Sequence, residues 1–346
     1  MRKKNVTIKD VAALADVSFA TVSRAIADRP EISEATKARV REACAQLGYV
    51  PNAAAKGLAG RATQTIGLIV PDISNPFFSD IATAIEQTAA QHSYRVLLSN
   101  SLRDPELEYQ AIDNFLARQV DGLLISPASP LTQAQHSQLL GNMPCVYLGV
   151  NHDETCSYVM SDNESGAYAA TNYLLQLGHR DILFVGGRET SRTRQLRLRG
   201  FYRAMEDAGL QGRDVAVAES IGVMKQWGTD QALELLADPL PDAVFAFSDT
   251  IALRIMEAAE MRGIRIPEDI SLVGYDNISF SALPRIHLTT VSQKKFRLGA
   301  IAVERLIEKI QGKQEKTTDV LDAELVIRST CSRKEKGEKN LDWTSK

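Results

Sequence analysis

The stretch from Thr65 onward constrains the fold most, because short apolar runs alternate there with longer amphipathic segments. The first run is Ile66–Val70, and an apolar pattern at helical spacing follows it through Ile81, Ile85 and Ala89. Near-continuous apolar strands that alternate with helices are typical of parallel sheets covered by helices on both faces. The other apolar runs predict strands at residues 95–99, 122–125, 145–148, 158–160, 182–185, 215–218, 243–247, 271–274 and 324–328.

The second half of this series predicts a separate sheet. Its strands are divided by helical segments that end at Gly178, Gly209 and Gly263, and glycine is the commonest residue just after a helix. So many strands fit two sheets better than one. We therefore expect two lobes, each built on a doubly wound parallel sheet.

Residues Thr7–Ala27, TIKDVAALADVSFATVSRAIA, indicate two short helices joined by a tight turn. Thr7 and Asp10 have the spacing of a capping box at the start of the first helix. Asp16 tolerates the left-handed conformation that the turn needs, and Ser18 is a good cap for the second helix. The apolar residues predicted to face inward are Ile8, Val11, Ala12, Leu14, Val22, Ala25 and Ile26.

The first turns of the second helix present a mixed outward face, where a recognition helix would enter the major groove. This face consists of Phe19, Ala20, Thr21, Ser23 and Arg24. The alternative is a pair of surface helices in a larger fold. The context favours a DNA reader, because the basic leader Arg2–Lys4 precedes the pair and a third capped helix, Ser33–Leu47, follows it and ends at Gly48.

Charge is distributed unevenly along the 346 residues. The first 62 residues carry 11 Lys and Arg against 6 Asp and Glu, a net charge of +5, whereas the whole chain has −3. The remainder therefore carries −8. This division fits a small module that contacts phosphates, attached to an acidic body that does not.

Composition limits the classes of protein to which the chain can belong. The chain is 44% hydrophobic and 24% charged, which is ordinary for a globular protein. It has no run of 18 apolar residues and no apolar segment behind its basic leader, so we expect neither a membrane span nor a secretion signal, and a cytoplasmic location. We expect no metal and no cofactor, since the cysteines lack metal-ligand spacing and fit reduced structural thiols. They are Cys44, Cys145, Cys156 and Cys331.

Three phrases carry a resemblance to a known family: TIKDVAALADVSFATVSRAI, LGYVPNAAAKGLAG and TQTIGLIVPDISNPFF. In order and spacing they resemble the lac-repressor/purine-repressor family of bacterial transcription regulators, and the resemblance continues to about Arg328. It implies an all-α helix-turn-helix headpiece at 1–50, a hinge helix or linker at 51–61, a periplasmic-binding-protein-like core at 62–332 and a polar tail at 333–346. The implied N-lobe spans about 62–160 and 292–320 and the C-lobe about 161–291 and 321–332, with crossings near Ser161, Val291 and Leu321.

The family's hinge helix folds on operator DNA, where its leucine wedges into the minor groove, and Leu58 is that leucine by position. An exposed Leu on an Ala-rich segment has no core of its own, but it can unstack a base step and bend the duplex. The alternative is a linker with one apolar residue. Gly57 departs from the family and costs a helix about 1 kcal/mol relative to Ala. The predicted DNA-contacting residues are Thr7, Ser18, Phe19, Ala20, Thr21, Ser23, Arg24, Asn52, Lys56 and Leu58.

Ligands of open parallel sheets bind outside the carboxyl ends of the strands, so polar residues at those ends are candidates for an effector site. Carboxylates and amides can accept sugar hydroxyls, while aromatic rings can stack on a sugar face or on a purine. The resemblance makes Arg197 the ligand-clamping arginine and Asp276 the acidic ligand residue. Helix capping is the alternative role for Asp72 and Ser248. The predicted effector-binding residues are Asp72, Asn75, Phe77, Phe78, Ser126, Ser191, Arg197, Asp249 and Asp276.

The sequence thus predicts a regulator that represses carbohydrate-utilisation genes by binding a near-palindromic operator as a dimer. Some members of the family form tetramers through a helical tail, and this polar tail lacks repeated heptad leucines, so the resemblance implies a dimer. The predicted effector is a sugar or sugar phosphate, and the alternative is a purine or nucleoside. A phosphocarrier protein is a further candidate partner. A solute-binding protein of a transporter would share both lobes but would require export. An enzyme is not expected, because Gly186-Gly187 lacks phosphate-loop spacing and no catalytic motif is present.

Overall fold

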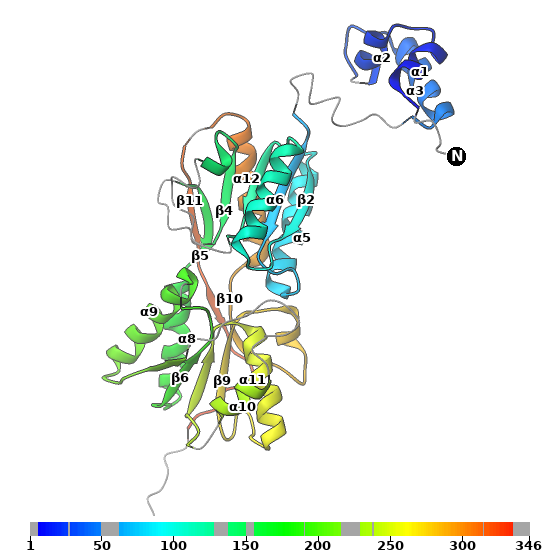
Figure 1. Cartoon of the computed structure of the whole chain (residues 1–346). Helices are drawn as coiled ribbons and strands as arrows, with labels where there is room; N and C mark the ends of the chain where they lie inside the picture. The colour runs from blue at the N-terminus through cyan, green and yellow to red at the C-terminus, as the bar shows by residue number, and fades with distance from the viewer. Residues whose placement is uncertain are drawn as a thin grey trace, which may run out of the picture. The chain divides into compact units, whose positions relative to one another are not determined.

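The computed structural model describes residues 6–26, 28–49, 62–127, 138–149, 156–189, 191–215, 229–236, 239–313 and 315–334. The chain divides into two compact units, Met1–Thr63 and Gln64–Lys346, and each is described by itself (Figure 1).

The first unit is a bundle of short helices, α1 (Ile8–Leu14), α2 (Phe19–Ile26) and α3 (Glu34–Leu47). The predicted capping box is present, since the Thr7 amide donates to Asp10 Oδ2 at 2.7 Å. Asp16 has φ +49°, as the predicted turn requires, and Gly48 ends α3 with φ +62°. The core packs Val11, Ala15, Val22, Ala25, Val40 and Ala43 together.

In the part of the chain that the structure describes, the second unit contains two six-stranded sheets. The first has the order β2 (Arg95–Asn100), β1 (Thr65–Val70), β3 (Gly122–Ile125), β4 (Cys145–Leu148), β5 (Tyr158–Ser161) and β11 (Thr318–Leu321). The second has the order β7 (Arg213–Val215), β6 (Ile182–Val185), β8 (Ala243–Ala246), β9 (Ser271–Asp276), β10 (Thr289–Ser292) and β12 (Glu324–Val326).

Neighbouring strands are parallel throughout both sheets except for the antiparallel pair β10–β12. The predicted pair of parallel-sheet lobes is therefore confirmed. The strand order of each sheet reverses beside its first strand, between β1 and β3 in one lobe and between β6 and β8 in the other. Such reversals open a crevice at the carboxyl ends of the strands, where ligands of doubly wound folds bind.

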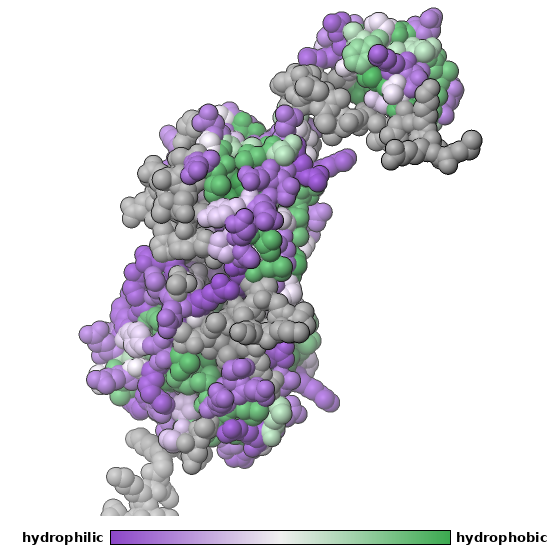
Figure 2. Space-filling model, viewed as in Figure 1, coloured by the Kyte–Doolittle hydropathy of each residue, from purple (hydrophilic) through white to green (hydrophobic). Residues whose placement is uncertain are grey.

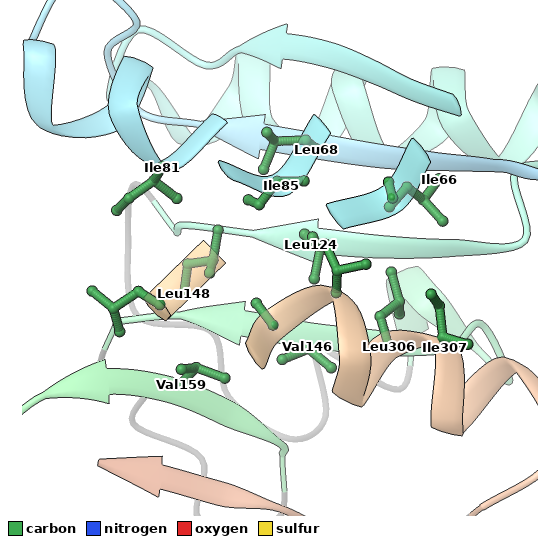
Figure 3. Close-up of a cluster of buried hydrophobic side chains, with 14 of the residues drawn as sticks. Ile66, Leu68, Ile81, Ile85, Leu124, Val146, Leu148, Val159, Leu306 and Ile307 are labelled. Atoms are coloured by element: carbon green, nitrogen blue, oxygen red, sulfur yellow. The ribbon is translucent and has the colours of Figure 1, made fainter. Parts of the chain in front are cut away.

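Helices cover both faces of the N-lobe sheet because its strand residues alternate between two apolar layers. Ile66 and Leu68 pack beneath two helices, as Figure 3 shows, whereas Ile69 belongs to the layer on the opposite face. Gly299 lets the two helices on the first face approach closely, since a Cβ there would lie 2.9 Å from the Ile81 carbonyl. The first face carries α5 (Pro76–Gln91) and α12 (Lys295–Ile310), and the other carries α6 (Pro105–Ala117).

The C-lobe sheet is enclosed in the same way. One apolar layer contains Val185, Val244 and Leu272, and the other contains Phe184, Phe245 and Val273. The first layer is covered by α10 (Thr229–Leu235) and α11 (Asp249–Arg262), and the second by α8 (Asn163–Gln176) and α9 (Arg192–Asp207). A short 3-10 helix, η1 (Ser279–Ala282), follows β9.

The chain passes between the lobes where β5 leads into α8, where β10 leads into α12, and where β11 leads into β12 (Figure 1). Two of these crossings touch, since the Ser161 hydroxyl donates to the Gln293 carbonyl at 3.0 Å. These two crossings therefore run side by side between the sheets.

Several sequence-based details differ from the structure or reach beyond its described residues. Leu14 is 47% exposed rather than inward, because Ala15 takes the inner position at the end of the short first helix. Strands β10 and β11 were not predicted, because neither contains a continuous apolar run. The predicted strand at 215–218 is described only as far as Val215, and the strand predicted to reach Arg328 ends at Val326.

Candidate functional site

The first candidate site is the outer surface of α2 in the first unit. Val22 and Ala25 are buried in the core, which turns the rest of the helix toward solvent. Phe19 is 55% exposed although it is large and apolar. Ala20, Ser23 and Arg24 are exposed as well, and Thr21 is half-buried.

Polar caps hold this surface in place at the start of each helix. The Thr21 amide donates to Ser18 Oγ at 3.1 Å, which fixes the first turn of α2. Thr7 and Ser18 are both exposed beside the helix starts that they cap. An apolar ring, small side chains, hydroxyls and a guanidinium therefore lie on one surface, with the chemistry to contact base edges and phosphates. The predicted contacts Asn52, Lys56 and Leu58 lie outside the described residues.

The second candidate site is a cavity of about 380 Å³ between the two lobes of the second unit. Both lobes line it, with residues that follow β1, β2, β3 and β4 on one side and residues that follow β6, β8 and β9 on the other. Figure 2 shows hydrophilic side chains gathered at the waist where the lobes meet. The predicted effector residues that line the cavity are Asn75, Phe77, Phe78, Ser126, Ser191, Arg197 and Asp276.

Arg197 is held by several contacts in the cavity wall and is only 3% exposed. Its Nε donates to Asn163 Oδ1 at 2.9 Å, and its Nη1 donates to the Phe247 carbonyl. Its guanidinium carbon lies 3.5 Å from the Tyr275 ring centroid, so the planar group stacks on an aromatic face. These contacts fix the guanidinium plane before any ligand arrives.

Asp276 lies opposite this guanidinium, with Oδ1 3.6 Å from Arg197 Nη2. Gln293 Nε2, from the β10–α12 crossing, donates to the same oxygen at 2.6 Å. Burial raises the pKa of the Asp276 carboxyl to about 7, although the Arg197 guanidinium opposes the rise. An opposed guanidinium and carboxyl can bind neighbouring hydroxyls of one ligand.

The N-lobe wall supplies rings and small polar groups. Phe77 and Phe78 pack edge to face, with ring centroids 5.0 Å apart. Asn75 caps α5 through Oδ1, which accepts from the Phe77 amide at 3.0 Å, so its NH₂ group is the part left to donate to a ligand. Ser126 follows β3 directly at the cavity wall.

Two predicted effector residues do not line the cavity, and their assignment is corrected. Asp249 is fully buried inside the C-lobe, where its carboxylate accepts from the Ile278 amide, the Ser281 hydroxyl and the Thr290 hydroxyl at 2.9, 2.6 and 2.5 Å. Asp72 folds back on its own turn, where Oδ1 accepts from the Ser74 amide and hydroxyl. Both carboxylates serve local structure.

The cavity also contains residues that the sequence did not single out. Arg103, Arg188 and Arg192 line it, as do Asn163 and Gln293. Arg188 and Arg192 lie on either side of the predicted Ser191 in the sequence, so their position after a strand could have identified them as site residues. Gln293 carried no such signal, because it lies in a crossing between the lobes.

The described residues contain no helix that could span a membrane. Within the same residues, no group of three or more His, Cys, Asp or Glu side chains could hold a metal ion. The four cysteines are free thiols in this structure.

Comparison with family models matches both units. The model described as bacterial regulatory proteins of the lacI family matches residues 7–52. The model described as periplasmic binding proteins and sugar binding domain of the LacI family matches residues 63–330.

Individual relatives match over nearly their whole length. Catabolite control protein A of Priestia megaterium is 36% identical over 314 residues, which cover 90% of this chain and 94% of the relative. The HTH-type transcriptional repressor PurR of Aliivibrio salmonicida is 36% identical over 333 residues, covering 94% and 99%. The crystal structure of the lac repressor dimer bound to operator and the anti-inducer ONPF matches with a TM-score of 0.81 at 30% identity, covering 95% of this chain and 100% of that one.

Proposed function

This chain belongs to the lacI family of bacterial regulatory proteins, and from that premise we propose that it represses carbohydrate-utilisation genes under the control of a small sugar-like effector. The single observation that carries this proposal is the pairing of an exposed α2 surface in one unit with a cavity between two lobes in the other.

In the proposed complex, two copies of the chain place their α2 helices in successive major grooves of a near-palindromic operator. The lac repressor structure, a dimer bound to operator, supports this arrangement. Arg24 and Ser23 supply donors for base edges, while Thr7 and Ser18 lie at helix starts, where phosphates bind well. We also assign Asn52, Lys56 and Leu58 to the operator complex, with Leu58 at the central base step.

The effector acts through the lobes. It contacts residues of both, so its affinity depends on the separation of the lobes. A ligand can change DNA affinity only to the extent that it binds one arrangement of the lobes more tightly than the other. For coupled sites this difference is typically about 1–3 kcal/mol. The Arg197–Asp276 pair suits vicinal hydroxyls, and Phe77 and Phe78 suit the apolar face of a sugar ring.

A second candidate effector is a purine or nucleoside, which the same two phenylalanine rings favour because a flat base stacks on them. A solute-binding protein would use the same cleft, but the α2 surface would then have no role. The proposed function contains no catalytic step, and its DNA target places the chain in the cytoplasm.

The proposal is tested by fluorescence anisotropy with labelled fragments from the promoter regions around its own gene. We expect one fragment to bind far more tightly than bulk competitor DNA at moderate salt. Arg24→Ala should weaken this binding by about 1–3 kcal/mol, because a base contact is lost. Arg41→Ala is the matched control, since this arginine lies on α3 with a side chain 65% exposed.

Two results would contradict the proposal. Equal losses in the Arg24 and Arg41 variants would remove α2 as the reading helix. Binding of every fragment no tighter than bulk competitor would remove the regulator function itself.

A further inference from the structure

The outer surface of α2 has an apolar part and a polar part. Phe19 and Ala20 are the first two residues of the helix, and both are exposed. Ser23 and Arg24 follow one turn later and are exposed as well. Because side chains four residues apart lie on the same side of a helix, Ser23 lies beside Phe19 and Arg24 lies beside Ala20. The surface is therefore apolar at the start of the helix and polar one turn later.

The ring of Phe19 is not part of the core of its own unit. It is 55% exposed, and the buried cluster of the first unit, with the partly buried residues packed against it, does not include this ring among the described residues. A phenylalanine ring in water lacks the favourable free energy that its burial would give. Figure 2 shows apolar residues on the surface of this unit among hydrophilic ones. The ring is therefore available to a partner that contacts the start of α2.

The hydroxyl groups nearest to the ring already serve the helix itself. Ser18 Oγ accepts from the Thr21 amide at 3.1 Å and shares a hydrogen bond with Thr21 Oγ1 at 2.8 Å. Thr21 is also half-buried. These hydroxyls fix the first turn, so the side chains that project from its exposed surface are a ring and a methyl group.

The charge of the first unit indicates what kind of partner covers this apolar start. The first 62 residues have a net charge of +5, whereas the rest of the chain has −8. A cationic module attracts the phosphates of a duplex at long range. This charge favours DNA over an apolar protein surface as the partner of the ring.

The four bases differ in what they present to an apolar side chain in the major groove. Thymine presents a 5-methyl group beside its O4 acceptor, whereas guanine, adenine and cytosine present only hydrogen-bonding groups there. A ring placed over such a group excludes water without replacing its hydrogen bond, which costs free energy. A ring placed over the thymine methyl group instead removes two apolar surfaces from water. An apolar side chain at the start of α2 therefore selects thymine.

We propose that Phe19 reads one thymine in each half of the operator through the 5-methyl group of the base, and that the short side chain of Ala20 leaves room for the ring in the groove. This inference rests on the proposed function, which requires only that α2 lies in the major groove of a specific site. It adds the identity of one base pair in each half-site and the chemical group that is recognised.

Replacement of thymine by deoxyuridine tests the inference, because it removes the methyl group and keeps both the base pair and the O4 acceptor. The operator is the tightest-binding sequence that the full chain selects from a pool of random duplexes. Symmetric pairs of thymines are replaced one pair at a time, and binding is measured by fluorescence anisotropy. We expect one pair to weaken binding about tenfold, or about threefold per half-site, since one buried methyl group is lost at each.

Cytosine provides the converse measurement at the same position. The thymine–adenine pair is replaced by a cytosine–guanine pair, with and without a methyl group on C5 of the cytosine. We expect the methylated duplex to bind more tightly than the unmethylated one by about the same factor, because the methyl group returns to the same edge of the groove.

Variants identify the residue that reads the methyl group. Phe19→Ala should bind the thymine operator about tenfold more weakly than the wild type, and should bind the thymine and deoxyuridine duplexes within about twofold of each other. Leu14→Ala is the matched control, because it truncates a 47% exposed apolar side chain on α1 of the same unit and should keep the wild-type ratio. Both variants should unfold at the wild-type temperature, since neither side chain belongs to the buried cluster.

Two results would overturn the inference. If no thymine pair changes wild-type binding by more than twofold, the ring reads no methyl group, as expected if a protein partner covers it instead. If Phe19→Ala keeps the wild-type ratio, another residue reads the methyl group. In both cases the chain still selects an operator, so the proposed function stands. A chain that selects no sequence from the pool overturns the proposed function and the inference together.

Discussion

At the scale of single residues, Asp276 is the group whose ionisation the fold alters most clearly within the candidate effector site. Burial raises the pKa of its carboxyl from 3.8 to about 7. The folded chain thus holds this proton more tightly than the unfolded chain does. The stability that the proton confers is present below about pH 4 and is lost progressively as the pH rises to about 7.

Asp276→Asn removes this titration. We expect the wild type to lose stability relative to the variant by up to about 1.4 kcal/mol per pH unit as the pH rises from about 5 toward 7, with little further change above that. Urea unfolding at a series of pH values measures the difference. Asp269→Asn is the control, since the Arg265 side chain lowers the pKa of that exposed carboxyl to about 2 and its charge does not change in this range. A constant difference for Asp276→Asn would show that the folded carboxyl is ionised throughout.

At the scale of elements, Asp249 joins three parts of the C-lobe. It begins α11, and its carboxylate accepts from Ile278 and Ser281 around η1 and from Thr290 in β10. Gly274 in β9 makes room for it, because a Cβ there would lie 2.2 Å from Asp249 Oδ1. The buried acid therefore sets the positions of a helix, a turn and two strands.

Asp249→Asn should lower the unfolding free energy by about 2–4 kcal/mol, because an amide NH₂ would face hydroxyl donors and leave one of them unsatisfied. Gly274→Ala should destabilise the same region, since the new methyl group displaces the carboxylate. Glu260→Gln, at an exposed position of α11, should change stability by less than about 0.5 kcal/mol. If Asp249→Asn is as stable as Glu260→Gln in urea titrations, the buried network does not stabilise the lobe.

The helices and strands that could be predicted are those whose own residues carry a recognisable pattern. Ile66–Val70 and Ile182–Val185 are apolar runs that only a strand buried on both faces explains, and the caps Thr7 and Ser33 mark helix starts. Strand β11, Thr318–Leu321, is short and mixed in polarity, so its pairing at the edge of the sheet with β5 depends on the strands already assembled there rather than on its own residues.

The residues of the candidate site differ in the same way in whether the sequence could predict them. Residues in the loops that follow strands, such as Asn75 and Ser126, could be placed at a ligand cleft by topology alone. Asp249 also follows a strand, but its direction into the lobe is set by donors 29 and 41 residues away in the sequence. Gln293 reaches the cavity from a crossing between the lobes, after a strand that no local pattern predicted.

At the scale of the whole molecule, the second unit works through its two lobes, and Lys295 connects them directly. Its Nζ lies 2.9 Å from Asp80 Oδ2 in the N-lobe and donates to the Asn277 carbonyl of the C-lobe at 2.6 Å. The neighbouring Lys294 instead pairs with Glu324, which lies across from β10 within the C-lobe sheet. Lys295 thus contacts residues of both lobes, whereas the ion pair of Lys294 is with the C-lobe strand beside its own crossing.

Lys295→Met should reduce the population of the lobe arrangement that binds effector, because the hydrogen bond from α12 to the C-lobe carbonyl of Asn277 is lost together with the ion pair to Asp80, while the apolar stem is kept. Apparent affinity falls with the competent fraction, so we expect a loss of about threefold to tenfold. Calorimetry with the tightest-binding compound from a panel of sugars, sugar phosphates and nucleosides measures it. Lys294→Met is the matched control and should stay within about twofold. If Lys295→Met also stays within about twofold of the wild type, effector affinity does not depend on this contact between the lobes, and the coupling that the regulator requires would have to pass through the crossings alone.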